Sequence, residues 1–401
     1  MDNQNEKYNI ICFSNQLWDY PLWTNKKHVM TRLAEQGHSV VFVDPPINTG
    51  RLFLRQVLNK KWSLRRLLTW EYSEGTVKII SPLNFLPFYN FLSKIHAWKI
   101  RQISGRWFTK KQRTVMWIYN VEIPGIDNYI KSIQHDLLIY DCVDNYAGFP
   151  KYDTKEKKAA VNKQEEILAR RADIVFATAP GLVDKLSKYN TNIHYTPNVG
   201  DYELFQNSRN NKQNIPDDLK SIPKPVIAFT GAIDEYKFDR SLMRKVASAY
   251  PNYSIVIIGP IALKDREGTI EEIGMADLGN VYFLGTKPYK KMPDYFAGFD
   301  VYIIPYQLND YTVGGCFPVK FHEGLAAGLP VVVTDLPAYQ PFEDVCYISK
   351  SHNEFVQNIR LALEEDNDVR IKERQKVAKE NSWTGKVSNL LELIDLEFKK
   401  K

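Results

Sequence analysis

Short runs of β-branched and aromatic residues recur along the whole chain, separated by polar or amphipathic stretches of helical length. Because these runs are continuously apolar rather than alternating, they are typical of strands buried on both faces, as in parallel sheets. Alternation of such strands with helices predicts an α/β fold with doubly wound sheets. The expected strands cover residues 8–14, 39–44, 77–80, 114–119, 136–144, 173–179, 224–231, 253–259, 280–285, 300–306, 330–335 and 346–349.

The series of strands and helices appears twice, and a polar stretch rich in Asn, Lys and Pro separates the halves. We therefore predict two Rossmann-like domains, residues 1–205 and 225–382, joined by a linker over 206–224. A closing amphipathic helix, residues 383–401, is expected to pack back toward the first domain. The two domains would enclose a cleft that faces the carboxyl ends of both sheets. Other helices are expected over residues 25–36, 154–172, 239–249 and 317–327.

Composition is that of a folded protein. The 401 residues are 44% hydrophobic and 25% charged, close to the averages for globular chains. No apolar run approaches the ~18–20 residues that span a bilayer, and the polar N-terminus does not resemble a signal peptide. The four cysteines lie far apart without a CxxC pair. We therefore expect a reduced, cytoplasmic protein.

The charge of the chain is unevenly distributed, although its sum is only +6. Residues 51–113 hold fourteen Lys and Arg against two acidic residues, a balance of +12, which leaves −6 elsewhere. Basic helices with interleaved aromatics are typical of segments that bind anionic membranes. The pattern predicts a peripheral protein at the inner face of the cell membrane. The alternative is a solvated face above a packed core. No nucleic-acid-binding motif accompanies the charge, so we expect no such partner.

Several familiar reactive motifs are absent from the sequence. It contains no GxGxxG or P-loop glycine pattern, no HExxH and no GxSxG elbow. The seven histidines never pair at metal-ligand spacing. The DxD at 366–368 lies in a polar stretch rather than after a buried strand, so we interpret it as solvated surface. The sequence predicts neither a bound metal nor a cofactor.

The most informative segment is residues 313–335, VGGCFPVKFHEGLAAGLPVVVTD. Gly314 and Gly315 permit close backbone approach, and Pro318 suits the first turn of a helix. A glycine-rich lead-in to a helix start favours a diphosphate. Lys320 and Glu323 share one helical face, where a lysine can hold phosphate oxygens and a carboxylate can accept from two vicinal hydroxyls. The alternative is an i,i+3 surface ion pair.

The stretch PVKFHEGLAAGLPVVVTD resembles the donor-site helix of family 4-like glycosyltransferases of the GT-B fold, whose pattern is P-x-K-x-x-E-(Y/A)-x-A-x-G-x-P-V-V. The stretches AFTGAIDEYKFDRSLMRKVASAYPNYSIVIIGP and NVYFLGTKPYKKMPDYFAGFDVYIIPY resemble further parts of the nucleotide-binding domain. YDCVDNYAGF, ADIVFATAPGLVDKL and HYTPNVGDYELF resemble first-domain landmarks. The resemblance covers about residues 8–398 and extends to bacterial enzymes of teichuronic-acid, capsule and exopolysaccharide assembly.

The resemblance implies roles for individual residues. Glu323 matches the glutamate that binds the nucleotide ribose, and Lys320 the basic residue facing the donor phosphates. Gly231 matches the glycine where backbone approaches the diphosphate, and Tyr289 lies in the loop that flanks the base. Many members carry E-x7-E, with an earlier glutamate on the donor sugar, and that position is Gly315 here. Neither the donor sugar nor the retaining stereochemistry can therefore be inherited.

Candidates on the acceptor side come from the first half. Asp144 follows an expected strand, where a carboxylate can act as general base in an inverting reaction or orient the acceptor in a retaining one. The alternative is a helix cap or loop hydrogen bond. Asn15 and Asp19 follow the first strand and are weaker candidates, with a polar loop as the alternative. His28 and His322 lack partner spacing, which favours structural roles.

These observations predict a metal-independent GT-B glycosyltransferase. Its donor would be a nucleoside-diphosphate sugar, with UDP as the expected nucleotide, and its acceptor a hydroxyl of a lipid-linked or growing cell-surface glycan. Lys320 and Asp144 are the expected catalytic residues. One alternative within the fold is a non-hydrolysing nucleotide-sugar epimerase. The other is a non-catalytic partner that binds glycan or lipid.

Overall fold

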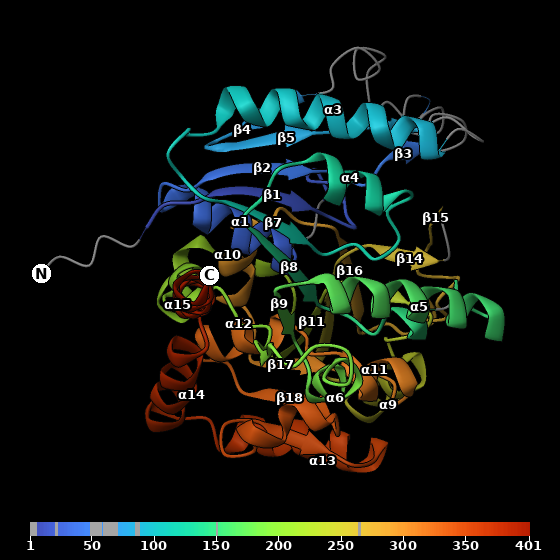
Figure 1. Ribbon diagram of the computed structural model, residues 1–401. Helices are drawn as coiled ribbons and strands as arrows, with labels where there is room; N and C mark the ends of the chain where they lie inside the picture. The colour runs from blue at the N-terminus through green and yellow to red at the C-terminus, as the bar shows by residue number, and fades with distance from the viewer. Residues whose placement is uncertain are drawn as a thin grey trace, which may run out of the picture. The chain divides into compact units, whose positions relative to one another are not determined.

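The computed structural model describes residues 6–20, 23–48, 58, 71–84, 89–149, 151–263 and 266–401 (Figure 1). The chain divides into two compact units. The first comprises Met1–Thr196 and Val387–Lys401, and the second comprises Pro197–Lys386. None of the described helices is both long and apolar enough to cross a membrane.

The first unit contains an eight-stranded sheet in the order β10-β9-β8-β7-β1-β2-β5-β4. β1 lies at its centre and pairs in parallel with both β2 and β7, whereas the edge strand β4 is antiparallel to β5. A two-stranded pair, β3 (Ile47–Asn48) with β6 (Leu83–Asn84), lies apart from it. The strands are β1 (Asn9–Phe13), β2 (Ser39–Val43), β4 (Glu71–Glu74), β5 (Val77–Ile80), β7 (Thr114–Ile118), β8 (Leu137–Cys142), β9 (Ile174–Ala177) and β10 (Ile193–Tyr195).

Helices cover this sheet with apolar faces. They are α1 (Asn25–Glu35), α3 (Tyr89–Trp107), α4 (Ile126–Ser132), α5 (Lys155–Arg171), α6 (Pro180–Leu186) and the last part of α15 (Trp383–Lys400). α15 is fixed within the first unit by Tyr8, whose hydroxyl donates to Asp395 and whose ring stacks on Phe398 at 5.2 Å. The end of α3 lies beside β4 and β5, since Arg106 pairs with Glu71 and Lys78 lies over the Trp107 ring (Figure 1).

The second unit contains a fully parallel six-stranded sheet in the order β16-β13-β11-β17-β18-β19. β11 separates β13 from β17, so the strand order reverses beside it, and ligands of doubly wound sheets bind at such a point. The strands are β11 (Val226–Thr230), β13 (Ser254–Ile258), β16 (Val281–Gly285), β17 (Val301–Ile304), β18 (Val331–Thr334) and β19 (Tyr347–Ser349). A small sheet is formed by β12 (Ile233–Asp234), β14 (Ile261–Leu263) and β15 (Arg266–Glu267).

The helices of the second unit pack on both sides of its core. They are α7 (Tyr202–Phe205), α8 (Asp217–Lys220), α9 (Arg240–Ala249), α10 (Met292–Phe296), α11 (Asp310–Gly315), α12 (Lys320–Ala326), α13 (His352–Glu364) and α14 (Asp368–Glu380). The C-terminal end of α12 is held by side chains, because Gln375 donates to the Ala326 carbonyl at 3.0 Å and Arg209 to the Gly328 carbonyl at 2.9 Å.

The predicted doubly wound α/β fold is confirmed, and each of the twelve expected strands is present. The edge strands β4 and β10 were not predicted, since their short polar sequences lack a continuous apolar run. The boundary between units differs from the expected linker over 206–224. Phe205, Leu219 and Ile222 are buried in the core of the second unit, so this polar stretch is part of that unit.

Candidate functional site

The entry to α12 differs from the expected glycine-rich lead-in. Gly315 ends α11, and residues 316–319 separate both glycines from the first residue of α12, Lys320. This difference arises from the way in which α11 begins. Asn309 accepts from the backbone N–H groups of Tyr311 and Thr312, while Thr312 Oγ1 accepts from the Asn309 N–H, a capping box that starts a helix before the glycines. Gly314 and Gly315 therefore do not form the start of α12.

Glu323 is buried in the second unit. Only 7% of the residue is exposed, and its Oε1 accepts a hydrogen bond from the Tyr289 hydroxyl at 2.6 Å. Burial raises the pKa of the carboxyl to about 7; the Tyr289 hydrogen bond opposes this rise, the Asp201 charge adds to it and Lys320 opposes it. The interpretation of Lys320 and Glu323 as a surface ion pair is therefore wrong, because Glu323 is bonded to Tyr289 inside the protein.

Lys320 lies above a glycine at the carboxyl end of β11. A Cβ atom built on Gly231, whose φ is +130°, would come within 2.0 Å of the Lys320 Nζ. The ammonium faces aromatic rings, 4.4 Å from the Phe229 centroid and 5.4 Å from that of Tyr306. Among the described residues no carboxylate forms an ion pair with it. Burial lowers the pKa of Lys320 to about 7, with a further lowering from Lys237.

A second glycine, Gly259, packs directly against the backbone of Gly231. A Cβ on Gly259, whose φ is +146°, would come within 2.0 Å of the Gly231 carbonyl oxygen. The two glycines follow the neighbouring strands β11 and β13, so no side chain lies between their backbones. Gly259 was not predicted from the sequence. The sequence feature that could have identified it is its position directly after an apolar strand, which Gly231 shares.

Lys237 is a further cation that was not predicted from the sequence. Its Nζ lies 3.2 Å from Asp234 Oδ2, and its backbone N–H donates to Oδ1 of the same carboxylate at 2.6 Å. Burial alone would lower the pKa of Lys237, but the Tyr306 hydroxyl and the Asp234 charge raise it well above its usual value. Lys237 is therefore held positively charged near Lys320, whose pKa it lowers.

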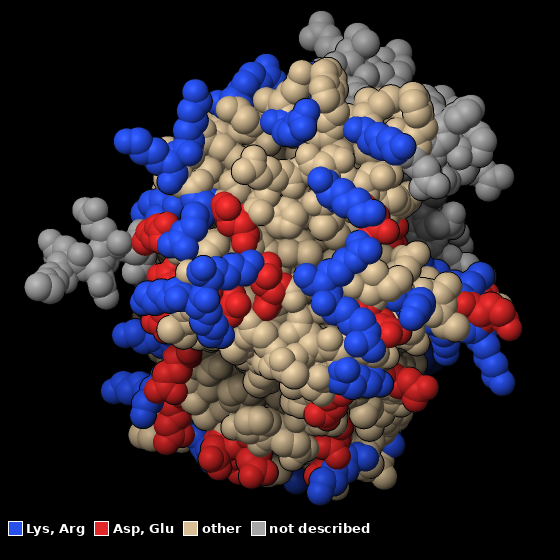
Figure 2. All heavy atoms as spheres, in the orientation of Figure 1, with Lys and Arg blue, Asp and Glu red and all other residues tan. Residues whose placement is uncertain are grey.

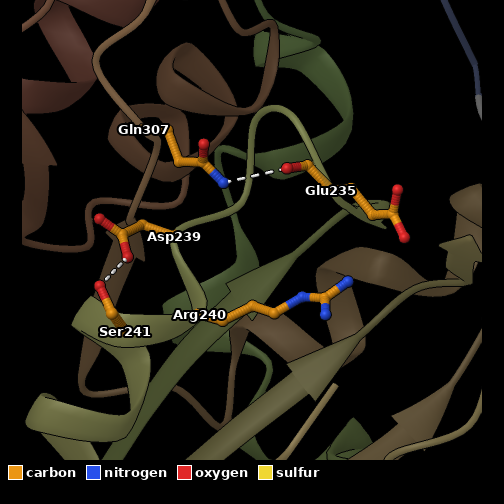
Figure 3. Close-up of a pocket in the computed structure, with 5 residues that line it drawn as sticks. All are labelled: Glu235, Asp239, Arg240, Ser241 and Gln307. Atoms are coloured by element: carbon orange, nitrogen blue, oxygen red, sulfur yellow. Dashed lines mark hydrogen bonds between the residues drawn. The ribbon is translucent and has the colours of Figure 1, made fainter. Parts of the chain in front are cut away.

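The loop that carries Lys237 also borders a hollow of about 530 Å³ (Figure 3). Figure 3 shows Arg240 extending into this hollow, while the Gln307 amide donates to the Glu235 carbonyl at 3.1 Å. Within the described part of the chain, the buried Nη2 atom of Arg240 has no hydrogen-bond partner. The hollow is lined by Glu235, Asp239, Arg240, Ser241 and Gln307.

Comparison with known proteins shows what this part of the chain is similar to. Residues 224–365 match the family described as glycosyl transferases group 1. The chain is 28% identical over 287 residues to a Bacillus subtilis protein named as the putative teichuronic acid biosynthesis glycosyltransferase TuaH, a match that covers 68% of this chain and 69% of that protein. The chain is a glycosyltransferase of the GT-B fold.

Solved structures share the fold of the transferase at low sequence identity. Sucrose-phosphate synthase from Thermosynechococcus elongatus has a TM-score of 0.68 at 13% identity, covering 98% of this chain and 100% of that chain. HepE from Anabaena, solved in complex with UDP-glucose, has a TM-score of 0.66 at 12% identity, covering 96% of this chain and 99% of that chain. The matched family segment contains Gly231, Lys237, Tyr289, Lys320 and Glu323.

The first unit of the transferase places two of its three predicted residues after the strands β1 and β8, which β7 separates in the sheet. Asn15 follows β1 and donates through Nδ2 to the Tyr146 hydroxyl at 3.2 Å. Asp144 is half-buried and lies two residues beyond β8 and two before Tyr146. Tyr146 in turn donates to the carbonyl of Tyr119, which follows β7. Asp19, in contrast, lies in an exposed turn.

Lys26 is a buried cation in the same region of the transferase that the sequence did not reveal. It is the second residue of α1 and is only 6% exposed, with its Nζ 5.8 Å from the Tyr119 ring centroid. Burial lowers the pKa of Lys26, and the charge of Asp144 is the largest influence that raises it. A lysine at a helix start is usually exposed, so only the tertiary structure indicates this one.

The two histidines for which the sequence favours structural roles lie in the interior of the transferase. His28 and His322 are almost fully buried, and burial lowers the pKa of His322 to about 3. The His322 ring stacks on Phe317 at 5.2 Å and meets the edge of Phe342 at 5.0 Å. Across the described residues, no three His, Cys, Asp or Glu side chains are grouped as metal ligands.

Proposed function

We propose that the transferase moves a sugar from a UDP-linked donor to a hydroxyl of a lipid-linked or growing cell-surface glycan. The observation that carries this proposal is the buried Glu323, bonded to Tyr289 and close to Lys320 above Gly231. Support comes from Anabaena HepE, a protein of the same fold solved with UDP and with UDP-glucose. TuaH, named for teichuronic acid biosynthesis, supports a cell-surface glycan as acceptor.

The donor is recognised through hydroxyls and phosphates. Glu323 accepts from the two vicinal hydroxyls of the ribose, and Tyr289, which already touches this carboxylate, flanks the base. The diphosphate approaches the backbone near Gly231, beside the Lys320 ammonium that lies against this glycine. Lys320 faces it as an ammonium without a carboxylate partner among the described residues, so the phosphate oxygens supply its counter-charge.

Transfer needs charge stabilisation at the donor and a proton acceptor at the acceptor. Negative charge grows on the departing diphosphate, and preorganised cations lower the barrier most where this charge develops. Lys320 and Lys237 fill that role in the proposal, with no metal ion or cofactor assigned. In the first unit Asp144 takes the proton of the acceptor hydroxyl or, in a retaining reaction, orients it.

The acceptor proposal includes a membrane. We place the transferase on the inner face of the cell membrane, bound as a peripheral protein through the basic residues 51–113. At the start of this stretch, residues 51–70 lie outside the described residues except for Leu58. The described part of this region includes α3 and the residues that follow it, which carry seven Lys and Arg and no acidic residue over 89–113.

Calorimetry on single variants tests the donor site. Glu323→Ala is expected to weaken UDP binding by about 1.5–3 kcal/mol, because a hydrogen bond to a charged group is lost. Glu373→Ala, an exposed glutamate on α14, is the matched control and should bind UDP as the wild type does. Asp144→Asn should bind UDP normally but lose transfer to acceptor.

Three outcomes would contradict this function. If Glu323→Ala remains folded and binds UDP as tightly as the wild type, the ribose assignment is wrong. If the wild type converts the donor into its epimer without acceptor, the protein is an epimerase. If it binds donor but neither transfers nor hydrolyses it with any glycan acceptor from a membrane extract, it is a binding partner rather than a transferase.

A further inference from the structure

The outward face of α3 carries an unusual concentration of apolar side chains. Of the twelve large apolar residues that are exposed among the described part of the chain, four lie on this one helix. Three of them, Phe91, Ile95 and Trp98, follow the i, i+4, i+7 spacing of a single helical stripe. They are 64%, 37% and 50% exposed. We call Phe91, Ile95 and Trp98 the apolar row.

The inward face of α3 is already occupied. Ala97, Ile100 and Ile103 are each at most 1% exposed and belong to the core of the first unit. His96 is buried beside them and is fixed by the Tyr129 hydroxyl and the Leu83 carbonyl. The helix is therefore anchored by its other side, and the apolar row is not a core stripe that awaits packing within the first unit.

Cations flank the apolar row on both sides. With 3.6 residues per turn, Lys94 and Arg101 lie along one side of it and Lys99 along the other. None of these three forms an ion pair with a described residue. Lys110 and Lys111, which follow the helix, also form no ion pair with a described residue. Figure 2 shows blue and tan spheres over α3 and no red sphere among those in view there.

We propose that the outward face of α3 docks on an anionic lipid surface, with the apolar row inserted among the headgroups. Charge complementarity selects this occupant, because a row of Phe, Ile and Trp between cations with no acidic residue suits anionic lipid. The aromatic rings suit the headgroup level, where amphipathic side chains settle. The docking face narrows the membrane binding of the proposed function to one side of α3 and rests on that function for its purpose, presentation of a membrane-bound acceptor, whereas donor binding and sugar transfer do not depend on it.

Vesicle flotation with the full chain tests the proposal. The wild type should bind phosphatidylglycerol-containing vesicles, bind pure phosphatidylcholine far less, and lose part of its binding in high salt. Phe91→Ser/Ile95→Ser/Trp98→Ser should reduce binding about tenfold or more, since insertion is lost. Lys94→Gln/Lys99→Gln/Arg101→Gln should reduce it about fivefold per charge at low salt.

A matched control carries three serines in place of exposed apolar residues elsewhere. Ile167→Ser/Val369→Ser/Leu396→Ser changes side chains that are 39%, 65% and 53% exposed on α5, α14 and α15, and it should bind vesicles as the wild type does. Trp98→Phe should still bind, yet it should lack most of the blue shift in tryptophan emission that vesicles induce in the wild type.

These measurements separate the docking face from the proposed function. UDP affinity should be unchanged in the apolar-row variant, which also shows that it is folded. Vesicle binding of the expected pattern by a wild type that consumes no donor would overturn the proposed function and support the docking face. Equal vesicle binding by wild type and apolar-row variant would overturn the docking face. So would conversion of a dimer to a monomer by that variant with vesicle binding unchanged, because the row would then be a protein interface.

Discussion

Two ionisable side chains of the proposed donor site have pKa values near neutrality, and the cause in each is burial. Burial favours the neutral form of both a carboxyl and an ammonium, so it raises the pKa of Glu323 and lowers that of Lys320, each to about 7. A bound anion favours the protonated form of a lysine in such an environment. Nucleotide binding at this site is therefore expected to be coupled to proton uptake.

UDP affinity should fall as the pH rises above 7. In the proposed function the diphosphate binds the protonated form of Lys320, and the free protein loses that proton as the pH rises through its pKa of about 7. The loss should approach about tenfold in affinity per pH unit up to about pH 8.5. Arginine stays protonated throughout this range, so Lys320→Arg should show a much flatter pH profile.

Calorimetric titrations should be carried out in the Glu323→Gln background as well, so that titration of this carboxyl does not contribute to the slope. If UDP affinity falls equally steeply with pH with and without the Lys320→Arg substitution in that background, Lys320 is not the group that takes up the proton on binding.

At the scale of elements, α12 is positioned by a segment that precedes it by more than a hundred residues. The residues 198–205 run along α12, where Asn198 donates to the Phe317 carbonyl at 3.0 Å and the Phe205 ring meets Tyr289 at 6.0 Å. Gly200 lies directly against the helix. Its absent side chain lets two backbones approach, so the position of Glu323 depends on this segment.

Gly200→Ala is expected to displace α12. The added Cβ would lie 2.7 Å from the His322 Cβ and 2.9 Å from the Glu323 backbone nitrogen, both shorter than ordinary contacts. We expect a loss of about 1–3 kcal/mol in the free energy of unfolding, as for other overpacked sites, together with weaker UDP binding. Chemical denaturation and calorimetry measure the two effects.

Gly279→Ala is the control, because a Cβ at Gly279 meets nothing within 4 Å. A Gly200→Ala chain as stable as this control, with unchanged UDP affinity, would show that α12 does not need the close approach.

At the scale of the whole molecule, buried histidines are unequally divided between the two units. His28, His38 and His96 lie in the first unit, and burial lowers the pKa of each, to about 4 for His38 and His96. The second unit buries His322 but also holds Glu323, whose pKa is raised. Because these pKa shifts are opposite in direction, the stability of the two units should depend differently on pH.

Acidification from pH 7 to 5 should destabilise the first unit more than the second. Below about pH 6.5 these histidines bind protons in the unfolded chain but not in the folded protein, where they are buried. Each buried histidine therefore lowers the free energy of unfolding by about 1.4 kcal/mol per pH unit. In the second unit the cost of His322 is offset, because folded Glu323 takes up a proton near pH 7 that the unfolded carboxyl, with its ordinary pKa of 4.5, binds only at lower pH.

Scanning calorimetry at several pH values measures this difference. UDP identifies the transition of the second unit, since a ligand raises the melting temperature of the unit that binds it. A single transition, or two that shift equally with acid, would contradict the prediction.

The fold, and the helix that carries the proposed donor residues, follow from local patterns in the chain. Strands buried on both faces need a continuous apolar run, and each of the twelve runs forms a strand. The segment 313–335 could be identified because Lys320, Glu323 and Gly328 belong to one helix and its end, where spacing along the chain fixes spacing in space. Gly231 and Tyr289 were reached only through the family resemblance.

Which groups meet at the site depends on the tertiary structure instead. Tyr289 bonds to Glu323 across 34 residues, Gly259 approaches Gly231, and Lys26 is buried near Asp144, because contacts across strands depend on sheet order rather than on local pattern. The start of α12 was placed too early since the Asn309 cap encloses Gly314 and Gly315 in α11. Residues 206–224 have a linker's composition, yet the few apolar side chains among them reach the core of the second unit and bind the stretch to it.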